Sequence, residues 1–203
     1  MSSRPFDRSK AGDILTDAGT QVDRGYIAVV AYSATEAVAA DADALLNDGA
    51  CSGTAATTLT PTGTLPCARN IVITADGTAD DIKAVQAVVH GTNIAGETIS
   101  ETMPAFTVNT KGAVTGSKAF ATVTSVVVPA MDGAGVTLDI GFGSKLGLPF
   151  ELSRNTLLYT FFNDVKESTP ATVATSASAI ESNTITLAST LNGSAVKAYF
   201  VVE

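Results

Sequence analysis

The pattern of apolar and polar positions along the chain is that of short β-strands separated by turns. The clearest example covers residues 136–142, where every second residue is apolar: Val136, Leu138, Ile140 and Phe142. A period of two places alternate side chains on the same face of a strand. This segment therefore predicts a strand with one buried and one exposed face.

Residues 82–103 predict two strands folded back on each other. β-Branched residues, which favour strands, lie on both sides of the segment from Gly91 to Gly96. That segment contains two glycines and an asparagine, residues that readily adopt the positive φ angles of turns. We therefore expect a β-hairpin with a longer loop.

Other apolar runs predict further strands, and Gly, Pro, Asn and Asp separate them. One of them, Tyr26 to Tyr32, is apolar throughout and is interpreted as a buried strand. The segment from Ala50 to Pro66 is interpreted as an irregular connection or as short edge strands. The remaining predicted strands cover residues 71–74, 119–128, 156–162, 184–187 and 196–202.

One segment has the pattern of a helix. Ser33 and Glu36 have the spacing of a capping box, and apolar residues follow at helical intervals until Gly49. This predicts a helix from about Thr35 to Asn47. An alanine-rich strand and loop is the alternative, because the apolar stripe is narrow.

About nine short strands and at most one short helix predict an all-β fold of the β-sandwich or jelly-roll-like type. The chain of 203 residues fits one such domain. We expect residues 1–24 to be an extended N-terminal arm and residues 25–203 a single β-sandwich domain. Within that domain, residues 25–66 are the irregular entry region and residues 67–203 hold the core strands. A tail with no role is the alternative for the arm.

Composition and charge exclude several classes of partner. The net charge is -8, and the chain has no Trp. Binding to nucleic acid or to an anionic membrane needs clustered Lys and Arg, so neither is expected as a partner. No apolar run approaches the roughly 20 residues of a membrane span, and the N-terminus lacks the apolar core of a signal peptide. We therefore expect synthesis in a cytoplasm.

No complete catalytic or metal-binding constellation is visible. His90 is the only histidine. The close carboxylates, Asp80 with Asp81 and Glu97 with Glu101, lie in or beside polar turns, where solvated acids are common. The glycine-rich residues 133–147 lack the order of a phosphate-binding loop, and Asp41-Ala-Asp43 lacks the other ligands of a calcium loop. We expect no enzymatic activity, no cofactor and no metal.

The two cysteines, Cys51 and Cys67, leave two alternatives open. A disulfide between them would contribute about 3 kcal/mol and would form in an oxidising exterior. The other alternative is a pair of unpaired, partly buried thiols.

Three segments resemble known proteins: the GTN-x-x-G-E turn of Gly91 to Glu97, the GSKAF of Gly116 to Phe120, and the GFGSKLGLP of Gly141 to Pro149. From Pro66 to about Leu152 the chain is similar to a family of small structural proteins of tailed bacteriophages and prophages. The final strand region, SNTITLASTLNGSAVKAYFVV, is also similar.

The resemblance implies a virion head protein of the decoration or cement type. Such a protein binds the outer surface of the assembled capsid and bridges neighbouring subunits. Its partners would be the major capsid protein and copies of itself, which we expect as a homotrimer because the core is built from small side chains. It would be made in the host bacterial cytoplasm and reside on the virion. The expected capsid-binding residues of the arm are Arg4, Phe6, Arg8, Lys10, Ile14 and Leu15.

A receptor- or glycan-binding β module of a tail or head fibre is the alternative function. The acidic, threonine-rich and Trp-free composition favours the capsid role, because carbohydrate sites usually present exposed aromatic side chains.

Overall fold

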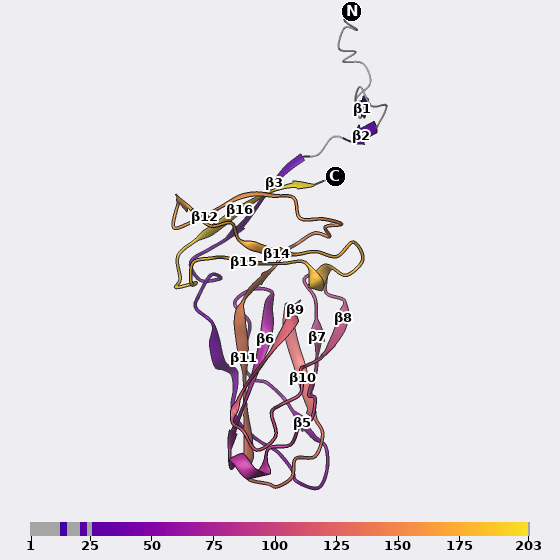
Figure 1. Cartoon of the computed structure of the whole chain (residues 1–203), viewed down its shortest axis with the longest axis vertical. Helices are drawn as coiled ribbons and strands as arrows, with labels where there is room; N and C mark the ends of the chain where they lie inside the picture. Colours follow the sequence, from indigo (N-terminus) through magenta and orange to yellow (C-terminus); the bar gives the residue numbers. More distant parts are fainter. Residues whose placement is uncertain (1–12, 16–20, 24–25, 203) are drawn as a thin grey trace, which may run out of the picture.

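The computed structural model describes residues 13–15, 21–23 and 26–202. Within these residues the protein is all-β, as the sequence predicts, and its only helices are two single 3₁₀ turns, η1 (Ala79–Asp81) and η2 (Ile180–Ser182). Figure 1 shows an elongated body with β3, β12 and β16 at one end and η1 at the other.

The strands of the described residues form four antiparallel sheets. Their orders are β1-β2; β5-β10-β7-β8; β14-β15-β11-β6-β9, with β4 also paired to β11; and β13-β12-β16-β3. The strand bounds are β1 Asp13–Leu15, β2 Gln21–Asp23, β3 Tyr26–Tyr32, β4 Asp41–Ala50, β5 Thr57–Leu59, β6 Arg69–Gly77, β7 Val88–Thr92, β8 Thr98–Thr102, β9 Gly112–Phe120, β10 Thr122–Val128, β11 Val136–Gly147, β12 Leu157–Phe162, β13 Val165–Lys166, β14 Thr172–Ala174, β15 Thr184–Thr186 and β16 Val196–Val202.

Two sheets pack face to face and form a sandwich. Apolar residues from β4, β6, β9 and β11 meet residues from β5, β7 and β10 in one buried cluster. Ile71 and Ile73 of β6 and Val126 of β10 are fully buried in it. The predicted alternation of β11 is confirmed, since Val136 and Leu138 lie in the same cluster. The predicted hairpin is also confirmed, as β7 and β8 pair from Val88↔Thr102 to Thr92↔Thr98.

A second buried cluster lies at the other end of the body. It contains residues of β3, β15 and β16 together with the loops that pack beneath them, and Phe200, Val196 and Leu148 are fully buried in it. The strands β3, β12, β13 and β16 form one sheet over this cluster, which we call the terminal sheet. The core predicted as one sandwich is therefore divided into two.

Strand β11 joins the two clusters. Its first half pairs with β4 on one edge and β6 on the other, and its last residues pair with β15. Leu138 lies in the sandwich cluster and Leu146 in the second one. One continuous strand thus fixes the register of both ends of the body.

A buried arginine lies beside β11 where it passes from one cluster to the other. Arg69 has no exposed surface, and its guanidinium donates hydrogen bonds to the carbonyl oxygens of Gly143, Glu36 and Val38. It also lies over the Phe142 ring, 4.8 Å from the centroid. Burial lowers the pKa of Arg69, but the five donors of a guanidinium are well matched to several carbonyls at once.

The expected helix at residues 35–47 is wrong. The capping-box contacts do form, with Ser33 Oγ donating to Glu36 Oε2 at 2.6 Å, but they close only a single turn. The carbonyl oxygens of Glu36 and Val38 accept from Arg69 instead of from a continuing helix. Residues 41–50 then form β4, because pairing with β11 satisfies their backbone groups.

The strand assignments also need three corrections. The entry region, residues 25–66, is less irregular than expected, because it supplies β3, β4 and β5. The strand predicted at residues 119–128 is the end of β9 followed by β10, with Ala121 between them. Strand β9 was missed because GAVTGSKAF has little apolar alternation, and β13 and β14 because they are only two and three residues long.

Replacing Arg69 with Met should lower the free energy of unfolding by about 3 to 5 kcal/mol, because buried carbonyl oxygens lose their donors. Urea unfolding followed by circular dichroism measures this change. Lys111→Met is the matched control, since Lys111 forms an exposed ion pair with Asp76, and it should change the midpoint little. Equal effects of the two substitutions would contradict the role given to Arg69.

Tyr32 should make stability fall at alkaline pH. Its hydroxyl is buried and donates to the carbonyl oxygen of Gly147 at 2.8 Å, and burial raises its pKa far above the ordinary value. The hydroxyl of Tyr32 loses its proton at about pH 10 in the unfolded chain, whereas the folded chain retains it. The free energy of unfolding therefore falls as the pH rises above that value. Unfolding curves of wild type and Tyr32→Phe should show a shallower fall for the variant. Parallel curves would contradict this prediction.

Candidate docking surface

The exposed large apolar side chains of the described residues gather on the terminal sheet. Eight such side chains are exposed, and six of them lie on three strands of this sheet. They are Tyr26, Ile27 and Val29 on β3, Leu158 and Tyr159 on β12, and Val165 on β13. Only Ile94 and Val108 lie elsewhere. Scattered exposed apolar residues are ordinary, whereas apolar residues that share one face of a sheet can form an interaction surface.

Strand alternation places three of these six side chains, Ile27, Val29 and Tyr159, on one face of the terminal sheet. On β16, Val196, Ala198 and Phe200 are buried in the second cluster, so the residues between them point to the other side of the sheet. The register aligns Tyr199 with Val29 of β3 and with Tyr159 of β12. We call the side that carries these residues the outer face. Its apolar members are Ile27, Val29, Tyr159, Phe161, Tyr199 and Val201, and the register places Lys166 and Lys197 on the same side.

Three aromatic rings form the centre of the outer face. The ring centroids of Tyr159 and Tyr199 are 4.8 Å apart, and Phe161 lies 5.8 Å from Tyr159 and 5.9 Å from Tyr199. The Lys166 ammonium lies 5.6 Å from the Tyr159 centroid. Aromatic side chains with a polar atom at one end are enriched in protein interfaces.

The two edges of the terminal sheet are open. β3 pairs only with β16, so its other edge has no partner strand among the described residues. At the opposite edge, β13 covers only Phe161 and Phe162 of β12. A groove of about 470 Å³ lies there, and its walls include Leu158, Tyr159, Lys166 and Pro170. Open edges with apolar residues are sites for pairing with another chain.

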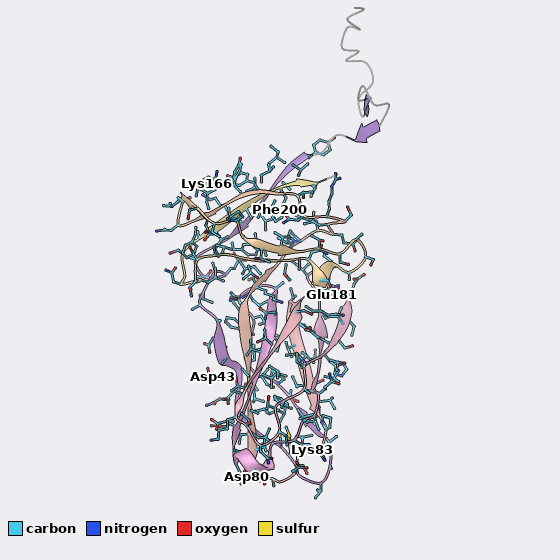
Figure 2. The ribbon with its side chains drawn as sticks, viewed as in Figure 1. Asp43, Asp80, Lys83, Lys166, Glu181 and Phe200 are labelled. Atoms are coloured by element: carbon cyan, nitrogen blue, oxygen red, sulfur yellow. The ribbon has the colours of Figure 1, made fainter. Side chains whose placement is uncertain are left out.

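Charge distinguishes the terminal sheet from the rest of the body. Lys166 and Lys197 lie on its strands, and Lys197 Nζ contacts Asp164 Oδ1 at 2.6 Å. Residues 38–147 carry ten Asp or Glu against five Lys or Arg, a net charge of -5. Figure 2 places Lys166 at the end with the terminal sheet and Asp80 at the opposite end. The acidic charge is thus concentrated away from the apolar surface.

The expected arm residues lie mostly outside the described residues. Arg4, Phe6, Arg8 and Lys10 are among those the structure does not describe. Ile14 and Leu15 lie on β1, which pairs with β2 through Ile14↔Val22 and Leu15↔Gln21. Figure 1 draws β1 and β2 beyond the start of β3, on the side of the body that carries the terminal sheet.

The residues considered for chemistry have structural contacts instead. His90 is half-buried on β7, and its carbonyl oxygen accepts from Thr124 Oγ1. Asp81 Oδ2 accepts the Gly135 backbone N–H at 3.0 Å. Glu101 is buried and accepts from both the backbone N–H and the hydroxyl of Ser117, at 2.6 and 2.7 Å. In the described part of the chain, no group of three or more His, Cys, Asp or Glu side chains is placed to hold a metal ion.

The motifs that carry the resemblance also hold the fold together. In the Gly91 to Glu97 turn, Asn93 Oδ1 accepts the backbone N–H groups of Ala95 and Glu97 at 3.0 Å. At Gly141, a Cβ would lie 2.0 Å from the carbonyl oxygen of Asp41, so β4 and β11 approach as closely as they do only because this residue is glycine. The residues of these two motifs therefore have structural roles in a turn and in the close approach of two strands.

The outer face is what the sequence interpretation missed. The apolar run Tyr26 to Tyr32 predicts a buried strand, but β3 is an edge strand whose residues alternate in exposure. The available signal was three aromatic residues in LLYTFF and two in VKAYFVV. The absence of Trp was weighed against an aromatic surface, yet Tyr and Phe alone assemble one.

Both cysteines are free thiols in the structure, which matches the unpaired alternative. Cys51 is buried in the sandwich cluster, whereas Cys67 packs against the second cluster. Burial raises the pKa of each thiol to about 11.

Comparisons with protein-family models, with curated proteins and with solved structures find no match to this chain. Among the described residues, no helix has the length and apolar character needed to cross a membrane.

Thiol counting tests the state of the cysteines. In urea without reductant, a thiol-specific reagent should react with two thiols per chain. In the folded protein at about pH 8 the reaction should be slow, because the raised pKa leaves little thiolate. A chain that gives no thiols until a reductant is added would show that Cys51 and Cys67 are bonded.

Proposed function

We propose that this protein is a non-enzymatic virion structural protein of tailed bacteriophages that binds the outer surface of the assembled capsid. It stabilises the shell by bridging neighbouring capsid subunits, and its main partner is the major capsid protein. The resemblance of residues 66–152 to phage structural proteins supports this class.

The observation that carries the proposal is the apolar outer face of the terminal sheet. A face with the Tyr159, Phe161 and Tyr199 cluster at its centre and open strand edges is suited to bind a protein surface. No catalytic arrangement accompanies it among the described residues. A binding role is therefore better supported than an enzymatic one.

Charge supports one orientation on the shell. The terminal sheet carries Lys166 and the ion pair of Lys197 with Asp164, whereas residues 38–147 carry a net charge of -5. A negatively charged sandwich is repelled by packaged DNA and is best placed in solvent. In the proposed orientation the terminal sheet contacts the shell and the end with η1 points outward.

The N-terminal segment supplies the second contact. β1 and β2 are three residues each and pair with no third strand among the described residues. A two-stranded hairpin of this size is marginally stable by itself, and ordering each residue costs about 1 to 2 kcal/mol. Binding to a shell would stabilise it, and two linked contacts bind more tightly than either one alone.

A glycan- or receptor-binding module of a fibre is the second candidate. The exposed Tyr159 beside the groove of about 470 Å³ favours it, because sugar rings stack on aromatic side chains. Assembly of the chain into homo-oligomers stays a prediction in both cases.

Deleting residues 1–24 should leave a folded β protein that binds capsids much more weakly than the intact chain. Co-sedimentation with heads that lack the protein measures binding, and circular dichroism checks the fold. Heads carrying the intact chain should also withstand a higher temperature before they release DNA, because each copy bridges neighbouring subunits.

Tyr159→Ser combined with Tyr199→Ser separates the two candidates. The capsid role predicts weaker binding to heads and no binding of the intact chain to host-cell polysaccharide. Equal decoration of heads by the intact and truncated chains would contradict the role given to the arm. A failure of the intact chain to decorate heads would contradict the capsid role. Polysaccharide binding that this double variant abolishes would support the fibre module.

A further inference from the structure

The open edge of β3 has a composition that natural edge strands usually avoid. Tyr26 to Tyr32 is seven residues long and contains no charged residue and no proline. Tyr26, Ile27 and Val29 are 73%, 64% and 53% exposed. Proteins normally protect an open edge with Lys, Pro or a bulge, because unpaired backbone groups there recruit another strand.

We propose that β3 pairs antiparallel with β3 of a second copy of this chain, around a two-fold axis that passes through Val29. This inference rests on the proposed function and names an interface between copies on the capsid, with a two-fold pair in place of the expected homotrimer. The paired residues would be Val29 with Val29 of the second copy, and Ile27 with Ala31. Pairing centred on Val29 matches all seven residues of β3, and strand addition satisfies the backbone groups of both edges.

The symmetry of this pairing agrees with the outer face. A two-fold axis perpendicular to a sheet leaves both copies with the same side facing outward. Two terminal sheets would therefore form one eight-stranded sheet, with both aromatic clusters on one surface. A shell could contact this enlarged surface while both sandwiches point away from it.

Charge allows two acidic chains to meet at this edge. Each chain has a net charge of -8, but β3 contributes no charge to the contact. The nearest strand, β16, places Lys197 opposite Ala31, and Lys197 is neutralised by Asp164. No like charges are placed directly opposite each other by the proposed register.

The area at the edge predicts a weak pair. An aromatic side chain presents roughly 150 to 250 Å², and Ile and Val present less, so the exposed parts of Tyr26, Ile27 and Val29 amount to at most a few hundred Å² per copy. A stable interface buries about 800 Å² per partner. The pair should therefore dissociate in dilute solution and form at high concentration or on a shell that holds copies side by side.

Cross-linking of the full chain tests the register. Val29→Cys places a thiol at the proposed axis, so a short bis-maleimide should convert this variant alone into a covalent dimer. The native chain and Val108→Cys are the controls. Cys51 and Cys67 react slowly because burial raises their pKa, and Val108 is exposed but lies away from the terminal sheet. Neither control should give a dimer.

Sedimentation equilibrium provides the second readout. The wild-type chain should change from monomer to dimer mass as concentration rises, and Val29→Lys should raise the dissociation constant at least tenfold while circular dichroism stays unchanged. Ile94→Lys, at an exposed apolar position outside the terminal sheet, should leave the dissociation constant unchanged. A strict monomer at millimolar concentration, or a trimer mass, would overturn the proposal.

Two other occupants of the edge give different results. If β3 pairs with the opposite edge of a second copy, Val29→Cys cross-links only when mixed with Leu158→Cys. If a capsid strand occupies the edge, Val29→Cys cross-links to capsid protein on heads and not to itself. Either result overturns the proposed pair. A dimer that forms in solution while the chain fails to bind heads would keep this inference and contradict the proposed function.

Discussion

Arg69 is buried where β11 leaves one hydrophobic cluster and enters the other. A charge without exposed surface is costly unless its donors are satisfied, and here the carbonyl oxygens of Gly143, Glu36 and Val38 accept them. These carbonyls belong to β11 and to the segment that joins β3 to β4. The arginine thus holds the segment that leads from β3 into β4 against β11. A polar network of Asn93, Lys118 and Glu181 connects η2 to β9 and to the loop after β7, with Lys118 Nζ 3.3 Å from Glu181 Oε1.

The apolar residues of the outer face belong to neither of the two hydrophobic clusters. Only one side of the terminal sheet packs on the second cluster, and the strands of the sandwich pack in the first cluster. The outer face is left without a covering layer among the described residues. Burying such a face contributes about 25 cal/mol per Å², which makes association with another protein the natural way to remove it from water.

The strands with a strong local signal were predictable from the sequence, and the arrangement of the sheets was not. Residues 136–142 alternate without fault, and the Asn and Gly residues near residue 93 define a hairpin loop, so both features depend on local chemistry. The segment from Val38 to Asn47 has helical spacing but forms most of β4. Its local preference for a helix is weak, and two long-range interactions outweigh it: strand pairing with β11 and the hydrogen bond from Arg69 to the Val38 carbonyl oxygen. The exposure of β3 was also not predictable, since a core strand and an exposed edge strand can both have an entirely apolar sequence. The candidate surface depends on how β3, β12 and β16 align, which no short stretch of sequence records.

The central claim is that the terminal sheet is the face by which this protein docks on a capsid. Electron cryomicroscopy of heads with and without the chain tests it most directly, because the body is elongated and its two ends differ in shape (Figure 1). The account predicts density in which β3, β12 and β16 lie against the shell and the η1 end points into solvent. Density with the η1 end on the shell, or density confined to the tail, would contradict it.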